Sequence, residues 1–282
     1  MCLRASRMCS RVGGGKLFEY NKAIVEVVYD YAKSIKTNIS LPPIKRDVRA
    51  IIVNGNEAAA IGKILGGLRF QTYYPITPAA DESFFIEAHN IVSLDPVTEE
   101  AKALEKAGVV VVQTEDEISA INMAIGAGIA GARAATATSG PGLSLMVEGT
   151  GGFAGMNEVP IVITHYQRAG PSTGMATRNS QSDLRFVMHM GHGEFPRIVI
   201  SSGDHRETIE DAYKALNWAE RYQMPVFHLV DKALANSYST VIWDIDKKAL
   251  KIDRGLIVTK DDNDYRRFRI TKDGVSPRSI PG

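Results

Sequence analysis

Three short stretches of the sequence carry residues that could do chemistry. Asp116-Glu117 places two carboxylates at the head of an Ala- and Gly-rich run. Ser139-Gly140-Pro141-Gly142 is a glycine-bearing turn, and Arg168 opens a third stretch with the hydroxyls of Thr173 and Thr177. A carboxylate on a small-residue helix, a backbone that a ligand can approach closely and a planar guanidinium suit a flat heterocyclic cofactor and a small anionic substrate.

Each stretch also has an ordinary structural explanation. Taken alone, Thr114-x-x-Glu117 is better explained as a capping box, in which the two side chains satisfy free backbone amides at a helix start. The helix that follows shifts the balance, because its many Ala and Gly residues let another body approach the backbone. A glycine turn by itself is weak evidence, but 11 of the chain's 25 glycines fall between Gly126 and Gly174. Such crowding favours close approach to a ligand.

Arg168 with its neighbouring threonines could be a solvated loop or a bidentate site for a small carboxylate, and the residues alone leave both open. Thr77 lies between Pro75 and Pro78, which stiffen the turn and fix the direction of its hydroxyl. The alternative for Thr77 is a rigid loop without chemistry. His165, His189 and His192 lack metal-ligand context, so core or surface roles are expected for them and no metal site is predicted.

Short apolar runs alternate with helical patterns along most of the chain. A helix is expected over 17–35, and strands over 50–53, 70–74, 109–113, 134–138, 160–164, 198–201 and 226–230. The strands precede helices at 57–68, 80–89, 116–130, 143–154, 206–221 and 232–235, except that 160–164 leads into a long loop. This alternation predicts an α/β fold, a parallel sheet with helices on both faces.

The candidate residues fall at comparable places in this pattern. Thr77, Glu117, Gly140 and Arg168 each lie in a turn after a strand, or in the first turn beyond it. Ligands of parallel sheets bind beyond the carboxyl ends of the strands. The four positions therefore predict a single site.

Composition limits the partners and the compartment. The chain has 282 residues and a formal net charge of +1, which provides no field for nucleic acid or an anionic membrane. Its two cysteines, Cys2 and Cys9, suit neither a disulfide scaffold nor an iron–sulfur cluster, so a cytoplasmic protein is expected. Residues 1–18 contain arginine and lysine but no aspartate or glutamate. We expect this segment to be a disordered tail or a cut end rather than an organelle-targeting peptide.

Several motifs together resemble the alpha subunit of 2-oxoacid:ferredoxin oxidoreductases of the pyruvate/2-oxoglutarate type in its archaeal form, in particular the thiamine-pyrimidine-binding domain. The motifs are Tyr74-Pro75-Ile76-Thr77-Pro78, Glu117 on its helix, Ser139 to Met146, and Gly170 to Gly174 with Thr177 and Gln181 to Leu184. The similarity runs from about Leu41 to Gly282. The resemblance implies a thiamine diphosphate-binding fold.

The resemblance also implies roles for the residues. Glu117 would contact the aminopyrimidine of thiamine diphosphate and favour its imino tautomer, with Ser139, Gly140, Pro141 and Gly142 also lining the cofactor. Thr77, Arg168 and Thr177 would hold the 2-oxoacid, so that its carboxylate has a fixed direction. Magnesium and the iron–sulfur cluster would belong to a beta subunit, coenzyme A would be the co-substrate, and ferredoxin would accept electrons.

The sequence also departs from the family pattern. Ala176 stands where the family usually has proline, and the signatures for diphosphate, magnesium and cluster binding are absent. We therefore expect three regions: a tail and helix over 1–45, a possible remnant of a preceding gamma-type domain; the pyrimidine-binding domain over 46–240; and over 241–282 a linker toward a missing C-terminal domain.

Three functions follow from these expectations. The first is a catalytic alpha-type subunit that is active only with a beta subunit. The second is a truncated, non-catalytic subunit for binding or assembly. A Rossmann-type nucleotide binder ranks last, because no convincing G-x-G-x-x-G follows the first strand.

Overall fold

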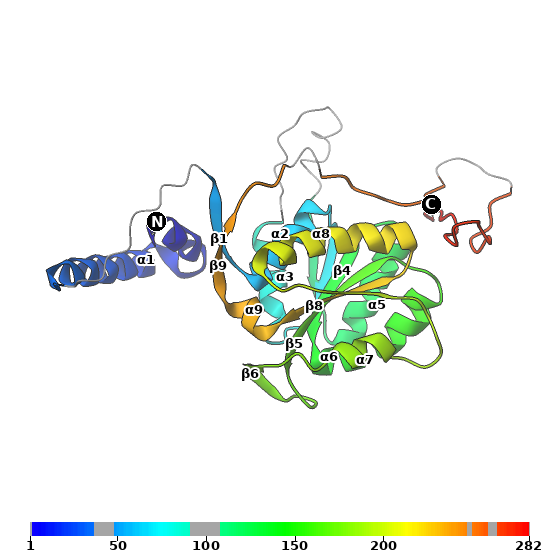
Figure 1. Cartoon of the computed structure of the whole chain (residues 1–282), viewed down its shortest axis with the longest axis horizontal. Helices are drawn as coiled ribbons and strands as arrows, with labels where there is room; N and C mark the ends of the chain where they lie inside the picture. Colours follow the sequence, from blue (N-terminus) through cyan, green and yellow to red (C-terminus); the bar gives the residue numbers. More distant parts are fainter. Residues whose placement is uncertain (1, 37–47, 91–107, 247–249, 259–263, 282) are drawn as a thin grey trace. The chain divides into compact units, whose positions relative to one another are not determined.

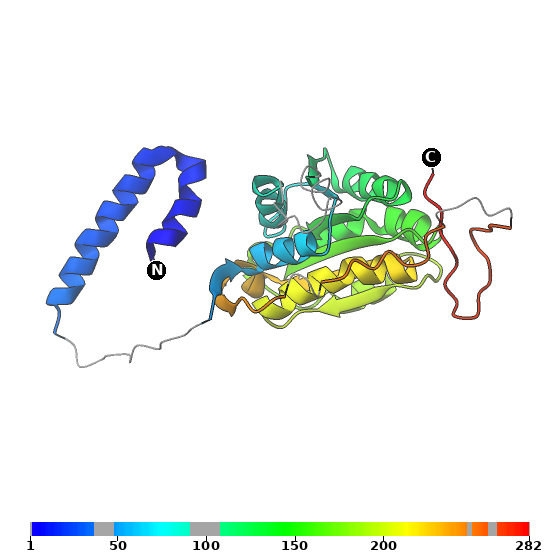
Figure 2. The same cartoon turned by 90° about the horizontal axis from the view of Figure 1, so that it is seen from above.

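The computed structural model describes residues 2–36, 48–90, 108–246, 250–258 and 264–281, with side chains from Lys16 on. The chain divides into two units: residues 1–52 with 242–244, and residues 53–241 with 245–282. The first unit contains α1 (Cys2–Ser34), which extends the helix expected over 17–35 toward the N-terminus. Its ribbon turns back on itself in Figure 2. The domain boundaries expected from the sequence stay predictions.

The second unit is built on a parallel sheet (Figure 1) with the strand order β3-β2-β4-β5-β8-β7. Its strands are β2 (Phe70–Tyr73), β3 (Val110–Gln113), β4 (Ala134–Ser139), β5 (Ile161–Ala169), β7 (Ile198–Ser201) and β8 (Pro225–Asp231). Every neighbouring pair along this order is parallel. The central strands β4, β5 and β8 are buried along almost their whole length, as strands covered on both faces must be.

Helices cover both faces of the sheet. On one face lie α2 (Gly55–Leu65), α3 (Ala80–Ala88) and α8 (His205–Tyr222), which share a core with Val162 and Val226. On the other lie α5 (Glu117–Ile129), α6 (Gly140–Leu145), the π-helix η1 (Gly149–Gly155) and α7 (Leu184–His189), around Ile161 and Ile163. α9 (Lys232–Asn236) follows β8 directly. The expected α/β class, with helices on both faces of a parallel sheet, is confirmed.

Two expected elements have a different place in the structure. β1 (Ala50–Asn54) was expected to begin the repeating pattern, but it pairs with β9 (Tyr238–Ile242) in a two-stranded sheet of its own. The expected long loop after residue 164 is instead a hairpin, because β5 continues to Ala169 and β6 (Met175–Asn179) returns antiparallel to it.

The small residues of α5 mainly allow this helix to pack closely against the sheet, rather than against a ligand. Thr72 on β2 donates from Oγ1 to the carbonyl of Ala120 at 2.7 Å. A Cβ at Gly128 would lie 2.9 Å from the carbonyl oxygen of Pro160. Gly126, by contrast, faces open space. The Ala/Gly content therefore mainly lets α5 lie close to the strands.

A buried polar cluster joins α2, α3 and the sheet. Lys63 on α2 forms an ion pair with Glu82 on α3, and both side chains are fully buried. Glu82 also accepts hydrogen bonds from Gln71 at 3.2 Å and from the hydroxyl of Tyr166 at 2.9 Å. Burial lowers the pKa of Lys63, while Glu82 opposes the shift. The carboxylate has charged and neutral donors, so the pair is satisfied inside the core.

A second buried cluster holds the described parts of the C-terminal segment, residues 250–258 and 264–281, against the sheet domain. Glu220 on α8 pairs with Arg133 at 2.6 Å, Arg254 at 2.7 Å and Arg278 at 2.9 Å. Backbone bonds between Arg278 and residues 256 and 258 close the segment on itself. One carboxylate thus fixes three arginines, two of them from the segment.

Candidate functional site

Glu117 occupies the first position of α5, directly after the loop that follows β3. Its neighbour Asp116 is the N-cap and accepts from the amide of Ser119 at 2.6 Å. The capping box that was the ordinary alternative for Thr114 and Glu117 does not form: Oγ1 of Thr114 lies 2.7 Å from the carbonyl oxygen of Asp116 and 3.2 Å from that of Tyr73. The side chain of Glu117 is thereby left available for another role.

The carboxyl group of Glu117 is buried: the residue is 6% exposed. Burial raises the pKa of Glu117, its own backbone amide opposes this, and the charge of Asp116 raises the pKa further. A carboxyl with a raised pKa can hold or share a proton closer to neutral pH than an ordinary glutamate.

Because Gly142 has no side chain, the carboxyl group of Glu117 can lie against its backbone. A Cβ at Gly142 would lie 2.6 Å from Oε1 of Glu117 and 2.2 Å from Oγ1 of Thr138. Both distances are shorter than van der Waals contact, so any side chain at 142 would displace the carboxylate. Thr138, on β4 and fully buried, was not among the residues expected from the sequence.

The rest of the Ser139–Gly142 turn divides between internal and outward roles. Ser139 is fully buried, and its Oγ donates to the carbonyl of Tyr166 at 2.7 Å, which ties β4 to β5. Gly140 and Pro141 form the first turn of α6 and are half-buried. A Cβ at Gly140 would meet only Asp183, at 3.8 Å. The backbone of Gly140 and Pro141 is therefore the accessible part of this turn.

Arg168 and Thr77 are brought together by the fold. The guanidinium of Arg168, on a residue 6% exposed, donates to the carbonyl of Thr77 at 2.6 Å and to that of Thr173 at 2.8 Å. The contact with Thr77 involves its backbone, and its side chain is exposed. Burial lowers the pKa of Arg168. Arg168 therefore links the loop after β2 to the tip of the β5–β6 hairpin, and each terminal nitrogen keeps one further N–H.

Thr177 lies on β6 and is exposed. The hairpin has an irregularity between Arg168 and Ala169, which pair with Asn179 and Met175 respectively. No hydrogen bond from the Thr177 hydroxyl occurs within the described part of the chain. Its side chain is free to face a ligand at the hairpin.

The sequence analysis also missed a partner for His165. Nε2 of His165, fully buried on β5, lies 2.8 Å from Oδ2 of Asp183, just before α7. The hydrogen bond to His165 lowers the pKa of Asp183. Asp183 stands in the Gln181–Leu184 motif, so its position in a conspicuous motif was a usable signal. The sequence does not show that His165 lies beside Asp183, because only the fold brings β5 and the start of α7 together.

Together these residues line one edge of the sheet. Glu117, Thr77 and Gly142 follow β3, β2 and β4, and Arg168 is the last but one residue of β5; these are four consecutive strands of the sheet. Neighbouring strands are about 4.8 Å apart, so the four ends span on the order of 15 Å. The missing side chain at Gly142 is what lets the carboxylate of Glu117 lie buried beside α6. The described residues contain no group of three or more His, Cys, Asp or Glu side chains that could hold a metal ion.

Comparisons with known proteins show the family of the chain. Residues 61–278 match the family model described as pyruvate flavodoxin/ferredoxin oxidoreductase, thiamine diphosphate-binding. The chain belongs to this family. Among the helices that the structure describes, none has the length and apolar character needed to cross a bilayer.

Curated relatives with high sequence identity are alpha subunits of 2-oxoacid:ferredoxin oxidoreductases. The chain is 56% identical over 265 residues to the alpha subunit of 2-oxoacid:ferredoxin oxidoreductase 1 of Sulfurisphaera tokodaii, covering 93% of this chain and 42% of that one. It is 59% identical over 252 residues to the corresponding subunit of Saccharolobus solfataricus, covering 87% and 39%. The chain thus spans about two fifths of the length of these relatives.

A solved structure shows the same fold. The 2-oxoglutarate:ferredoxin oxidoreductase from Magnetococcus marinus, with 2-oxoglutarate, coenzyme A and succinyl-CoA bound, has a TM-score of 0.81 and 35% identity. The match covers 99% of this chain and 46% of that one. The thiamine diphosphate-binding fold expected from the resemblance is confirmed.

Proposed function

We propose that this chain acts as the alpha-type part of a 2-oxoacid:ferredoxin oxidoreductase. The reaction would convert a 2-oxoacid such as pyruvate or 2-oxoglutarate and coenzyme A into acyl-CoA and CO2, with reduction of ferredoxin. The observation that carries the proposal is the buried carboxylate of Glu117 at the head of α5, packed against the glycine at position 142. The similarity to alpha subunits over 93% of the chain supports it.

Thiamine diphosphate, when bound, supplies the carbanion that attacks the 2-oxo carbon. Glu117 would hold a proton between its carboxyl and the pyrimidine nitrogen, a role that its raised pKa suits. Ser139 fixes the turn by its bond to β5, and Gly140 and Pro141 would face the ring with their backbone.

The substrate would be held at the neighbouring strand ends. Arg168 is fixed by two carbonyls, so its two remaining terminal N–H groups have a set direction toward a carboxylate. Thr77 and Thr177 would add hydroxyls from the loop after β2 and from the hairpin. Fixing the carboxylate in this way sets the direction of the bond that breaks on decarboxylation.

The remaining parts of the reaction would come from elsewhere. A beta subunit would hold the diphosphate, the magnesium ion and the iron–sulfur cluster, and would pass electrons to ferredoxin. We keep the expectation of a cytoplasmic protein that contacts neither nucleic acid nor membrane. The subunit assembly itself belongs to the proposal.

The test is Glu117→Gln in the complex with a beta subunit, which removes the charge and keeps the shape. We expect turnover, followed as reduction of methyl viologen with 2-oxoacid, to fall by roughly 10²-fold or more. Glu115→Gln, two residues away on an exposed side chain, is the matched control and should leave turnover unchanged. Turnover of Glu117→Gln equal to that of the unchanged protein would exclude the role.

The alternative is a non-catalytic subunit for binding or assembly. It predicts that the chain forms the complex with the beta subunit while no 2-oxoacid supports reduction of methyl viologen. Co-expression followed by mass analysis of the native complex and by this assay separates the two functions.

A further inference from the structure

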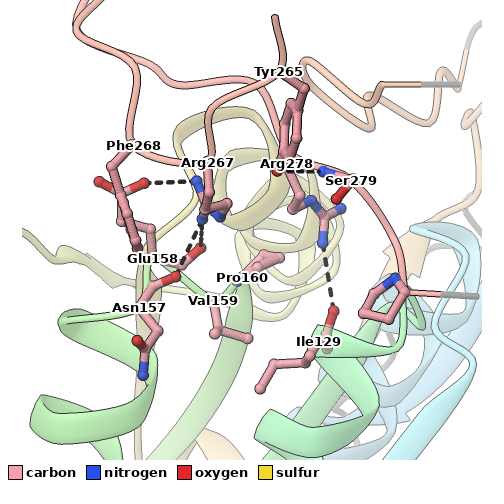
Figure 3. Close-up of a pocket in the computed structure, with 12 residues that line it drawn as sticks. Ile129, Asn157, Glu158, Val159, Pro160, Tyr265, Arg267, Phe268, Arg278 and Ser279 are labelled. Carbon is pink, nitrogen blue, oxygen red and sulfur yellow. Dashed lines mark hydrogen bonds and ion pairs between the residues drawn. The ribbon is translucent and has the colours of Figure 1, made fainter. Parts of the chain in front are cut away.

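Figure 3 shows a cavity of about 500 Å³ between the C-terminal segment and the end of α5, and its two arginines are already bound. Arg267 donates to Glu158 at 2.8 Å, and Arg278 donates to Glu220 at 2.9 Å. Both arginines therefore anchor the segment. A ligand site is better indicated by a polar group that the fold orients but leaves without a partner. Gln167 has such a group, at the opposite edge of the sheet.

Gln167 lies near the end of β5, on the face of the sheet that carries Glu117. Successive side chains of a strand point to opposite faces, so Gln167 shares a face with Ile161 and Ile163, which pack with α5. Arg168, the next residue, points to the other face. The two side chains therefore flank the strand end, with Gln167 on the side where the cofactor is proposed to bind.

The side-chain amide of Gln167 has a fixed orientation. Its Oε1 accepts from the backbone amide of Asp183 at 3.2 Å. A backbone N–H can donate only to the oxygen of this amide, so the positions of Oε1 and Nε2 are settled by the contact. Asp183 is itself held by the fully buried His165, whose Nε2 lies 2.8 Å from Oδ2. The acceptor side of Gln167 is thus fixed by the start of α7.

The nitrogen of the same amide is left with two unused N–H groups. No hydrogen bond from Nε2 of Gln167 occurs within the part of the chain that the structure describes, although the residue is only 4% exposed. Nε2 is also not one of the enclosed polar atoms that lack a partner, so it keeps contact with the surface. An oriented, nearly enclosed and unused donor suits an acceptor oxygen of a ligand.

This donor borders the turn whose backbone is proposed to face the cofactor. Oδ2 of Asp183 would lie 3.8 Å from a Cβ at Gly140. Ser139 is level with Tyr166 in the parallel register of β4 and β5, so Gln167, one residue further along β5, is level with Gly140. The free donor therefore lies at the same sheet edge as the candidate site, on its cofactor side.

We propose that Gln167 donates to the 2-oxo oxygen of the substrate while Arg168 binds the carboxylate, an inference that rests on the proposed function. In a 2-oxoacid these two groups are on adjacent carbons. The carboxylate must meet Arg168, and the 2-oxo carbon must meet the cofactor on the face of Glu117. A donor beside the strand end on that face fits the oxygen of the 2-oxo carbon. Because this oxygen gains negative charge when its carbon is attacked, the contact also stabilises the transition state.

The test is calorimetric titration of the complex with the beta subunit and thiamine diphosphate, using oxamate, an unreactive analogue with a carboxylate and a 2-oxo oxygen. Gln167→Met removes the donor and keeps the length of the side chain, so oxamate should bind roughly tenfold more weakly. Gln167→Glu keeps an oxygen for the amide of Asp183 but replaces the outward donor with an acceptor. It should weaken oxamate at least as much, whereas a merely structural role of the bond to Asp183 would leave Gln167→Glu unaffected.

Gln113→Glu is the matched control. Gln113 ends β3 at the same edge of the sheet; it is exposed, and its Oε1 accepts from the hydroxyl of Tyr73 at 3.3 Å, a bond that glutamate can keep. Its oxamate affinity should stay within about twofold of the unchanged complex. Equal affinity in the unchanged complex and in Gln167→Glu, or no saturable oxamate binding, would overturn the proposal. Because the titration needs no turnover, its result is separate from the Glu117→Gln test of the proposed function.

Discussion

Residue 142 shows how an absent side chain defines the site. The space that a Cβ would occupy there is bounded by the carboxyl of Glu117 and the hydroxyl of Thr138. Glycine at this position therefore lets the carboxylate of Glu117 stay buried where α5 and α6 meet.

Replacement of this glycine should be costly, whereas replacement of its neighbour should not. Gly142→Ala brings Cβ into collision with Glu117 and Thr138, and we expect a loss of roughly 1–3 kcal/mol in unfolding free energy. Gly140→Ala, whose Cβ would meet only Asp183 at 3.8 Å, should stay within about 0.5 kcal/mol. Urea unfolding of both variants measures the difference. Equal stability of the two variants would contradict the packing argument.

At this scale the sequence predicted the types of residue better than their contacts. Glu117, Gly142 and Arg168 were identified from motif and spacing, and the structure places them at one sheet edge. Thr138 was missed because a threonine in a buried strand looks like any core residue. The alternative capping box at Thr114 could not be told from the observed N-cap at Asp116, because both residue types favour a helix start. The bond geometry that decides between them is not visible in sequence.

At the scale of elements, the pair of Lys63 and Glu82 joins two helices that no apolar contact could fix as specifically. The pair is fully buried, and Gln71 and Tyr166 donate to the same carboxylate. Burial of charge is tolerated only when it is compensated in this way. The packing of α2 against α3 therefore depends on both partners together.

Removal of one partner should destabilise the protein strongly. Lys63→Met leaves Glu82 buried without its cation, and we expect a loss of about 3 kcal/mol or more. The double variant Lys63→Met, Glu82→Gln should recover part of this loss because no buried charge remains. Lys214→Met is the control: its side chain is 43% exposed and pairs with Glu210 at 3.5 Å, so its effect should stay below about 1 kcal/mol. Thermal unfolding of the four proteins measures these effects; a loss no larger than that of Lys214→Met would refute the argument.

The alternation of strands and helices was predictable because buried parallel strands are nearly continuous apolar runs. The predictions failed where partner choice decides the outcome. β1 has the same apolar character as the sheet strands but pairs with β9, and sequence does not show which partner a strand takes. The β5–β6 hairpin was expected as a loop because Met175–Asn179 is mostly exposed and shows no apolar alternation. The helix expected over 143–154 divides into α6 and the π-helix η1, whose glycines let Ile121 and Phe195 approach.

At the scale of the whole molecule, one histidine makes stability depend on pH. His228 is fully buried; its Nε2 lies 2.7 Å from the hydroxyl of Ser202, which in turn donates to Asp211 at 2.8 Å. Nδ1 of His228 has no partner among the described residues. Burial and the nearby charge of Lys63 lower the pKa of His228 to about 3. Unfolding returns the ring to its ordinary pKa of about 6.5, so the unfolded chain binds a proton that the folded protein excludes.

Stability should therefore fall as pH decreases below about 6.5, and the loss continues toward pH 3. The contribution of His228 is on the order of 3 kcal/mol by pH 4. Urea unfolding between pH 7 and pH 4 should show a flatter dependence for His228→Gln, which is less stable at pH 7 because it loses the bond to Ser202. His189→Gln, an exposed histidine, should keep the slope of the unchanged protein. Equal slopes for His228→Gln and the unchanged protein would disprove this assignment.

The two carbonyls that hold Arg168 have a consequence for evolutionary change. Because they come from the loop after β2 and from the hairpin tip, the guanidinium cannot be redirected without moving both. If Arg168 holds the substrate as proposed, recognition of the acid group would thus be insulated from sequence drift nearby. The exposed positions along β6 have no such restraint. Related chains could come to accept longer or shorter oxoacids by exchanging side chains there, while the charge anchor stays unaltered.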